Sequence, residues 1–341
     1  MKILVTGGAG YIGSTICSAL LDSGHTPIIL DSLITGCPEY TKNRIFYHGD
    51  IADGHLVRKI FSDHPEIRLT IHCAALISVP ESVKRPYEYY KENVAKSIEL
   101  FRHLIDADCP RLVFSSSASL YDAVPGFMVN EKTPLNPGSP YARSKLMIEI
   151  VLRDFCKAYG MKGISLRYFN PIGADPQMRS GIYSDSTLVL PTLMDAAMGK
   201  NTVFRITGTN WPTRDGSGIR DYIHVWDLAL AHVSAAEKFD KVLRQTDEDY
   251  PYLVINLGTG KGVTVRELVA AFEKALGINI HKVEAPPRPG DVAGAYANAD
   301  LAWKLLGWRA KMSIEQGIKD ALKWGEIRKT LLKAGIREVR T

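Results

Sequence analysis

The sequence contains few cysteines, and their spacing suggests neither cross-links nor a metal site. Its 341 residues include only five cysteines, an odd number, and no two of them form a Cys-x-x-Cys pair. A disulfide-stabilised secreted domain and a zinc site both need cysteines at close and regular spacing. The pattern therefore predicts reduced thiols, a cytoplasmic protein and no metal centre.

Long apolar runs and blocks of like charge are also missing. The apolar segment at residues 1–5 is too short for a signal peptide, and no later segment approaches the length of a membrane span. The 42 Lys and Arg exceed the 37 Asp and Glu by only five, and no basic run interleaved with aromatics would follow a nucleic acid backbone. These absences predict a soluble protein with no membrane and no nucleic acid as partner.

Short β-branched runs alternate with long amphipathic stretches through the first half of the chain. Apolar residues recur every three to four positions over residues 87–104, and again after Pro140 as far as residue 155, which predicts two helices. Alternating strands and helices indicate the α/β class, with a doubly wound parallel sheet. We expect strands at residues 3–6, 26–30, 45–47, 69–73, 112–115, 163–168 and 252–256.

After Tyr168 the pattern changes to a region rich in glycine and aspartate that reaches about residue 220. We expect a smaller domain, built from discontinuous segments, that caps the sheet. The predicted division assigns residues 1–169 and about 221–258 to the sheet domain. It assigns about 170–220 and 259–341 to a smaller C-terminal substrate-binding cap.

The first predicted strand runs into the glycine-rich segment "TGGAGYIG" at residues 6–13. Gly8, Gly10 and Gly13 form the pattern G-x-G-x-x-G, which allows a tight turn, a close approach to a diphosphate and a helix N-terminus aimed at its charge. Asp31 ends the next strand, where a carboxylate accepts hydrogen bonds from ribose hydroxyls and repels a 2′-phosphate. A glycine turn with a capping aspartate is the alternative, but the combined placement predicts a Rossmann-type domain that binds NAD in preference to NADP.

Tyr141 and Lys145 stand four residues apart in a predicted helix, so the phenol and the ammonium share one face. A cation about 4 Å from the phenol, at an effective dielectric of about 20, contributes about 4 kcal/mol, or roughly three pKa units before desolvation opposes it. A serine run at residues 115–119 closes the fifth strand, at the ligand crevice of such a sheet. Chance spacing and a serine turn are the alternatives. Together with the glycine loop, the set predicts a proton-transfer site.

Several segments carry a resemblance to a known family. The chain resembles the extended short-chain dehydrogenase/reductases and, within them, the UDP-glucose (UDP-galactose) 4-epimerases, over nearly its whole length. In that family a tyrosine takes the proton of the sugar 4-hydroxyl, C4 gives a hydride to bound NAD⁺, and the 4-keto sugar turns and takes the hydride back on its other face. The resemblance thus implies an isomerase for UDP-hexoses. It rests on "TGGAGYIG", "SSSAS", "YARSK", "RYFNPIGA", "GIRDYIHVWDLA" and "NLGTGKG".

The resemblance also implies roles for individual residues. Tyr141 matches the base, Ser117 assists at the 4-hydroxyl, and Lys145 holds the nicotinamide ribose and tunes Tyr141. The implied cofactor-binding residues are Gly7, Gly8, Gly10, Tyr11, Ile12, Gly13, Asp31, Asp50, Ile51, Asn93, Ser115, Tyr141, Lys145 and Tyr168. The implied substrate-binding residues are Ser117, Tyr141, Asn170, Leu188, Val189, Arg220, Arg288, Asp291 and Ala295.

Two of these matches leave alternatives. Arg288 and Asp291 match ligands of the UDP group, but without the resemblance they would be interpreted as an ion pair within a loop. Ala295 replaces a tyrosine found in members restricted to unacetylated hexoses, so we expect room for a 2-acetamido group and activity on UDP-GlcNAc and UDP-GalNAc. The alternative is that Ala295 is simply a packing residue and Tyr296 refills this space by a one-residue shift.

Other enzymes on the same scaffold are the nearest rivals. A 4,6-dehydratase needs an acid where this chain has Ser117-Ala118-Ser119, which disfavours dehydration. A UDP-uronate epimerase or decarboxylase remains the alternative, and an NAD-binding regulatory protein is the alternative outside the enzymes. The resemblance further implies a homodimer formed through the helices around residues 92–107 and 141–159. The chain departs from the family pattern at Ile77, Asp122, Leu188 and Thr207.

Overall fold

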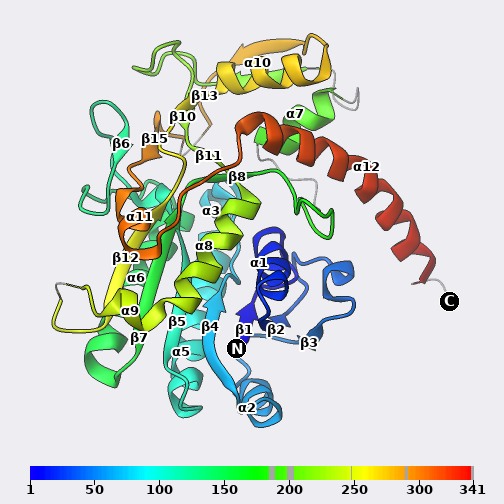
Figure 1. Cartoon of the computed structure of the whole chain (residues 1–341). Coiled ribbons are helices and arrows are strands. Elements are labelled where there is room, and N and C mark those ends of the chain that lie inside the picture. Colours follow the sequence, from blue (N-terminus) through cyan, green and yellow to red (C-terminus); the bar gives the residue numbers. More distant parts are fainter. Residues whose placement is uncertain (184–188, 198–202, 247, 289–290, 339–341) are drawn as a thin grey trace.

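Seven parallel strands form the central sheet of the computed structural model, which describes residues 1–183, 189–197, 203–246, 248–288 and 291–338 (Figure 1). Their spatial order is β12-β7-β5-β4-β1-β2-β3, and every neighbouring pair is parallel. All seven predicted strands are present, with ends that differ by no more than two residues from those expected. The strands are β1 (Lys2–Thr6), β2 (Thr26–Asp31), β3 (Ile45–His48), β4 (Ile67–His72), β5 (Arg111–Ser117), β7 (Lys162–Tyr168) and β12 (Tyr252–Leu257).

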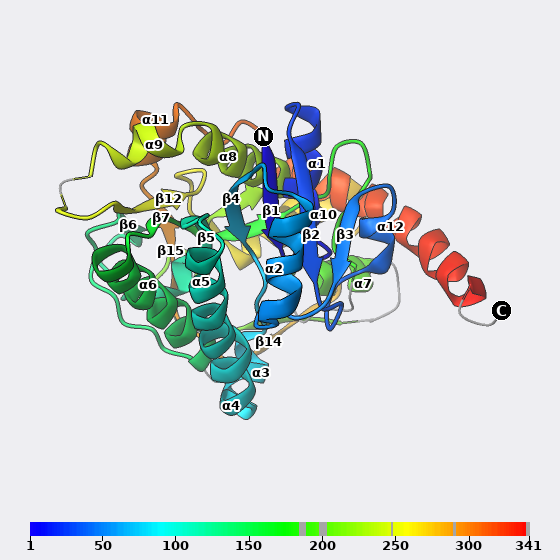
Figure 2. The same ribbon diagram turned by 90° about the horizontal axis from the view of Figure 1, so that it is seen from below.

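Helices cover both faces of this sheet, as Figure 2 shows, and confirm the doubly wound prediction. On one face lie α1 (Tyr11–Asp22) and α8 (Val225–Glu237), and on the other lie α2 (Gly54–Asp63), α5 (Lys96–Asp106) and α6 (Pro140–Tyr159). Successive strand side chains point to opposite faces. In β1, Ile3 and Val5 therefore join one apolar core while Leu4 joins the other.

The helix expected over residues 87–104 is interrupted. It consists of α4 (Pro86–Tyr89), a π-helical turn at Tyr90–Ala95, and α5. Such turns widen a helix locally and are frequent at functional sites. Here the turn contains the fully buried Asn93.

Smaller sheets lie beyond the carboxyl ends of the central strands. One contains β13 (Val263–Thr264), β10 (Ile219–Arg220), β15 (Gly294–Ala297) and β6 (Met128–Val129). Two further pairs join β11 (Tyr222–His224) to β8 (Asn170–Ile172) and β14 (Lys282–Ala285) to β9 (Phe204–Thr207). The surrounding helices are α7 (Val189–Ala197), α10 (Val265–Leu276) and α12 (Ile314–Glu338), whereas α11 (Asp300–Leu306) packs in the core of the central sheet beside α8. These elements place segments from late in the chain above the crevice of the sheet.

Within the described ranges, no helix combines the length and the apolar character needed to span a bilayer.

Candidate active site

The glycine loop joins β1 to α1 at the carboxyl edge of the sheet. Gly7 has a left-handed backbone (φ 72°), and its N–H donates to the carbonyl oxygen of Leu30 at 2.9 Å. A Cβ added to Gly13 would lie 2.1 Å from the carbonyl oxygen of Gly7, so only glycine fits there. Gly10 caps α1 without any side-chain acceptor for the first turn. The loop thus leaves a helix N-terminus available for an anionic group.

Asp31 is tied to this loop. Its Oδ2 accepts a hydrogen bond from Ala9 N at 2.9 Å, and its Oδ1 accepts one from Leu33 N at 2.8 Å. Each carboxylate oxygen keeps a second lone pair that a ribose hydroxyl can use. The glycine loop and Asp31 therefore fit the diphosphate and the adenosine ribose of NAD.

Tyr141 and Ser117 meet where α6 begins and β5 ends. Ser139 caps α6 by accepting a hydrogen bond from Ala142 N at 3.2 Å, and this starts the helix one residue before Tyr141. Burial raises the pKa of Tyr141, while a hydrogen bond from the Ser117 hydroxyl opposes that rise by stabilising the phenolate. Ser117 thus opposes the effect of burial on the Tyr141 phenol.

Lys145 reaches from α6 to the end of β5. Its ammonium is buried and donates a 2.8 Å hydrogen bond to the carbonyl oxygen of Ser115. Burial lowers the pKa of Lys145 to about 8, although Cys73 and Glu149 oppose this shift. This hydrogen bond joins α6, the helix that carries Tyr141, to the end of β5. Tuning of the Tyr141 pKa by Lys145 stays a prediction.

Tyr168 ends β7 beside these groups. Burial, followed by the nearby Cys73 and Tyr141, raises its pKa, while a hydrogen bond with Ser115 opposes the rise. Its ring centroid lies 6.1 Å from that of His232 on α8. Tyr168 thus lies close to the catalytic pair predicted from the sequence.

Two neighbours of Ser115 were missed by the sequence analysis. The Ser115 hydroxyl lies 3.1 Å from the sulfur of Cys73 and 3.4 Å from Nε2 of His232. Burial lowers the pKa of His232 to about 4, so the ring is neutral near pH 7. Cys73 directly follows β4 at the crevice, a position that could have marked it. His232 lies within α8 and has no motif to identify it.

Asn93 anchors the segment that follows β4. Its Oδ1 accepts a hydrogen bond from Leu76 N at 2.8 Å, and its Nδ2 donates to Leu76 O and Ser144 Oγ, each at 3.0 Å. Its amide hydrogens are therefore used inside the protein. Asp50 lies further along the same edge and forms an ion pair with Lys96 at 2.5 Å. Ile51, next to it, is buried.

The two arginines predicted to bind UDP are close enough for their charges to interact. Arg220 donates to the carbonyl oxygens of Ile219, Ala293 and Val292 at 2.7, 2.8 and 3.1 Å. Burial lowers its pKa, and the charge of Arg288 adds to this effect. Arg288 is ion-paired with Asp291 at 3.2 Å, so the loop ion pair that we weighed as an alternative is present.

Three other predicted substrate residues, Asn170, Leu188 and Val189, come earlier in the chain than the two arginines. Asn170 begins β8 and is paired with Tyr222 of β11, two residues after Arg220. Val189 begins α7, whereas Leu188 lies outside the described residues.

Ala295 and Tyr296 occupy successive positions of β15. Ala295 stands opposite Arg220 in the register with β10 and packs against a cluster that includes Tyr121 and Phe169. Tyr296 lies beside Gly262, where an added Cβ would be 2.6 Å from the tyrosine ring. Because neighbouring strand residues point to opposite faces, Tyr296 does not refill the space beside Ala295.

Three departures from the family pattern have clear positions. Ile77 is 58% exposed, so it contributes little to the core. Asp122 accepts a hydrogen bond from Asn136 Nδ2 at 3.2 Å and holds its loop. Thr207 ends β9, at the edge of the smaller sheets.

Comparison with known proteins agrees with this geometry. The NAD dependent epimerase/dehydratase family matches residues 3–258. A UDP-glucose 4-epimerase from Yersinia enterocolitica is 40% identical over 339 residues, covering 95% of this chain and 97% of the relative. The structure of a Bifidobacterium longum UDP-glucose 4-epimerase in complex with NAD⁺ and UDP has a TM-score of 0.87 at 34% identity, with 95% of this chain and 98% of that chain covered.

A third similar protein is the UDP-Glc/GlcNAc 4-epimerase of Campylobacter jejuni. Its structure has a TM-score of 0.79 at 33% identity, with 95% of this chain and 99% of that chain covered. The family match extends over more than half of the sequence, and it includes the glycine loop, Asp31, Ser117, Tyr141 and Lys145. The chain belongs to the NAD dependent epimerase/dehydratase family.

Proposed function

We propose that this chain is an NAD-dependent UDP-hexose 4-epimerase that interconverts UDP-galactose and UDP-glucose. The observation that carries the proposal is the 2.8 Å hydrogen bond from Lys145 to Ser115 O, which holds the helix of Tyr141 against the strand of Ser117 at the carboxyl edge of the sheet that also holds the glycine loop. The similarity to UDP-glucose 4-epimerases along nearly the whole chain supports it.

In this proposal Tyr141 is the general base for the sugar 4-hydroxyl. Ser117 donates a hydrogen bond that stabilises the phenolate. When bound, NAD⁺ would supply hydride transfer from and to C4 and a positive charge that favours the phenolate. Glycines 7, 8, 10 and 13 with Asp31 would hold its adenosine diphosphate half, and Lys145 and Tyr168 would lie at the nicotinamide half.

The substrate would be held through its UDP group. Arg220 and Arg288 provide the positive charge, and arginine suits a diphosphate because its donors form a planar fork. Both guanidiniums are already engaged, by carbonyl oxygens and by Asp291. We infer that binding of a diphosphate exchanges some of these contacts for stronger contacts to phosphate oxygens.

We further propose that the sugar pocket accepts 2-acetamido sugars. Ala295 presents a small side chain on the strand that pairs with Arg220, and Tyr296 lies on the opposite face. The similarity to an enzyme named for both UDP-Glc and UDP-GlcNAc supports this breadth.

A homodimer is part of the proposal. Exposed apolar side chains lie on α6 and on the helical turns that pack beside it, and a partner subunit would cover them. These are Val83, Tyr87, Met147 and Ile150, with exposed fractions of 42%, 72%, 40% and 40%.

Domain division and cell location stay proposals as well. We propose that the sheet segments, residues 1–169 and about 221–258, bind NAD, and that about 170–220 and 259–341 bind the UDP-sugar. We propose a cytoplasmic location because all five cysteines are free thiols.

A substrate panel tests the function. Purified protein is incubated with UDP-galactose, UDP-GalNAc and UDP-glucuronic acid, and each product is identified. We expect UDP-glucose and UDP-GlcNAc, without added nucleotide and without net reduction of bound nucleotide. Conversion of UDP-glucuronic acid alone would establish the uronate alternative, and nucleotide binding without any turnover would establish the regulatory one.

A further inference from the structure

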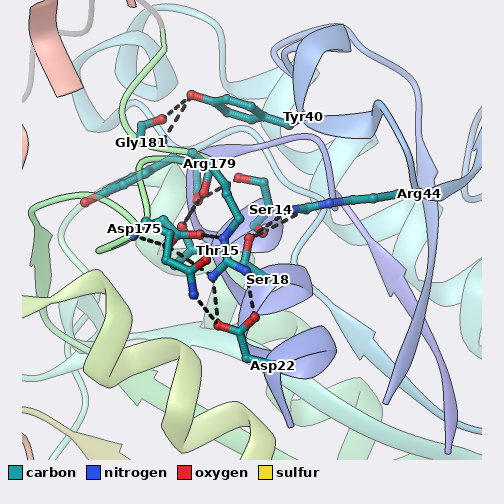
Figure 3. A network of polar contacts seen from close by, with 12 residues as sticks. Ser14, Thr15, Ser18, Asp22, Tyr40, Arg44, Asp175, Arg179 and Gly181 are labelled. Carbon is teal, nitrogen blue, oxygen red and sulfur yellow. Dashed lines mark hydrogen bonds and ion pairs between the residues drawn. The ribbon is translucent and has the colours of Figure 1, made fainter. Parts of the chain in front are cut away.

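Residues 173–183, which we call the strap, run from the end of β8 along the outer side of α1 (Figure 3). Asn170 precedes the strap and Val189 follows it in the sequence, and both belong to the proposed substrate site. The helix that the strap contacts, α1, begins at the glycine loop of the proposed cofactor site. The strap therefore joins substrate-binding segments to the cofactor-binding helix.

Arg179 makes the central connection. Its Nη1 and Nη2 donate to the two carboxylate oxygens of Asp22, the last residue of α1, at 2.7 and 2.9 Å. Its Nε and Nη2 donate to the buried carboxylate of Asp175, within the strap, at 2.6 and 3.1 Å. One guanidinium thus forms a bidentate pair on each side, which a lysine cannot reproduce.

The two ends of the strap are tied to cofactor-side elements by tyrosines. Tyr11, the first residue of α1, donates its hydroxyl to the carbonyl oxygen of Gly173 at 2.7 Å. Tyr40, in the segment that follows Asp31, donates to the carbonyl oxygen of Gly181 at 2.6 Å and accepts from Gly181 N at 3.2 Å. The strap is therefore held at its start, its middle and its end.

Further hydrogen bonds fix the conformation of the strap and tie it to α1 and to the cap. Asp175 N donates to the carbonyl oxygen of Ser180 at 2.9 Å, and this closes the loop that presents Arg179. The Ser180 hydroxyl lies 3.0 Å from that of Thr15 on α1. Trp324 of α12 donates to the carbonyl oxygen of Ile182 at 3.0 Å, so the cap holds the far side.

We propose that Arg179 is a positioning residue. It holds the substrate-binding segments at a constant position relative to α1 while the sugar rotates. The inference rests on the proposed function. In that reaction the keto sugar must rotate within the site while its UDP group stays bound in the cap. Its other face must then meet the reduced nucleotide. A displacement of about 1 Å can cost about 10²-fold in rate, so the two anchoring regions must hold their distance throughout.

Loss of this constant position has a specific consequence. If the strap loosens, the keto sugar escapes before the hydride returns to C4. The hydride, with its two electrons, then stays on the bound nucleotide, and the proton of the 4-hydroxyl stays with Tyr141. Each escape therefore produces one free keto sugar and one enzyme with reduced nucleotide, which can no longer start a cycle. A slower first hydride transfer, or a smaller fraction of folded enzyme, would lower kcat without raising the number of escapes per turnover.

The test compares Asp22→Asn, Arg179→Lys and Asp22→Glu with the wild type. Asp63→Asn, which removes an exposed ion pair with Lys59 on α2, serves as the matched control. Each protein turns over UDP-galactose, is passed through gel filtration, and is analysed for retained nucleotide and its oxidation state. Product and turnover number are measured in the same samples.

We expect Asp22→Asn and Arg179→Lys to accumulate reduced nucleotide about tenfold faster per turnover than the wild type, with Asp22→Glu close to the wild type. The control should match the wild type. Equal accumulation in all proteins would overturn the inference, even if kcat falls, because a merely structural role predicts only that fall. If Arg179→Lys folds poorly, the comparison of Asp22→Asn with Asp22→Glu and the wild type is sufficient, because Asp22 is partly exposed. A wild type without UDP-galactose turnover would instead refute the proposed function, and this inference with it.

Discussion

The ammonium of Lys145 and the carbonyl oxygen of Ser115 are joined by a 2.8 Å hydrogen bond, which ties the middle of α6 to the end of β5. The ammonium also lies 4.9 Å from the centroid of the Phe114 ring, in a cation–π arrangement. Lys145 therefore braces the helix that carries Tyr141 against the strand that carries Ser117. Ser117 is the side chain whose hydrogen bond opposes the rise in the Tyr141 pKa, and the tuning of that pKa by Lys145 stays a prediction.

Removal of the phenolic hydroxyl should separate chemistry from folding. We expect Tyr141→Phe to fold and to retain NAD, but to lose about 10²- to 10⁴-fold in kcat on UDP-galactose, because general-base catalysis contributes that much. Steady-state rates and nucleotide content after gel filtration provide the measurement. Near-normal turnover would show that Tyr141 and Lys145 are an ordinary pair of helix residues without a catalytic role.

Lys145 should make stability depend on pH in a defined window. Its folded pKa is about 8 against an ordinary value of 10.5. Between these values the unfolded state binds more protons, so the free energy of unfolding should rise with pH. Below pH 8 both states carry the charge and the folded state bears the full cost of burying it.

The matched variant is Lys145→Met, which lacks the titrating group. In protein stripped of nucleotide, the wild type should gain roughly 3 kcal/mol relative to this variant as the pH rises through that window. Urea unfolding at several pH values measures the difference. A difference that stays constant with pH would contradict the lowered pKa.

The buried ion pair between Arg167 and Glu149 should be sensitive to loss of either charge. The two side chains are each 5% exposed and lie 2.5 Å apart, and Ser116 donates a further hydrogen bond to Glu149. Removing one member leaves the other charge buried without a partner, so Glu149→Gln should cost about 3–5 kcal/mol in the free energy of unfolding.

The control for that prediction is Asp106→Asn, which breaks an exposed pair with Arg102. It should change stability by less than about 1 kcal/mol. Chemical denaturation of both variants is sufficient. Equal losses in the free energy of unfolding would show that burial does not decide how much an ion pair contributes to stability.

Substrate breadth should depend on the size of residue 295. We expect Ala295→Tyr to lose most turnover of UDP-GalNAc while turnover of UDP-galactose changes little, because the larger ring fills the space that we assign to the acetamido group. The ratio of kcat/KM for the two substrates measures this effect. A wild type inactive on UDP-GalNAc, or a variant with an unchanged ratio, would refute the assignment.

The apolar side chains on α6 give a test of the homodimer. Ile150→Glu places a charge on the surface that we propose a partner covers, so the molecular mass in solution should fall from two chains to one. Leu276→Glu, at an exposed apolar position of α10, should leave the mass unchanged. Light scattering after size exclusion distinguishes the two. Loss of dimer in both variants, or in neither, would point to another interface.

Much of the fold follows from local sequence patterns. The β-branched runs of β1 and β2 and the periodic apolar residues of α6 specify elements by short-range preferences, which act wherever the segment lies. The glycine loop is specified in the same way, because its left-handed backbone and its close contact with Gly7 O admit no side chain at Gly13. The spacing of Tyr141 and Lys145 also guarantees one helix face.

Tertiary structure decided where those side chains are directed. The spacing could not reveal that Lys145 donates to Ser115, that His232 lies beside the same serine, or that Arg179 pairs with Asp22, 157 residues away. Such contacts depend on how whole elements pack, and a single buried carbonyl or carboxylate can redirect a charge because unpaired buried polar groups are costly. The sequence by itself thus determined the elements and the chemistry available in them, while packing determined which groups meet.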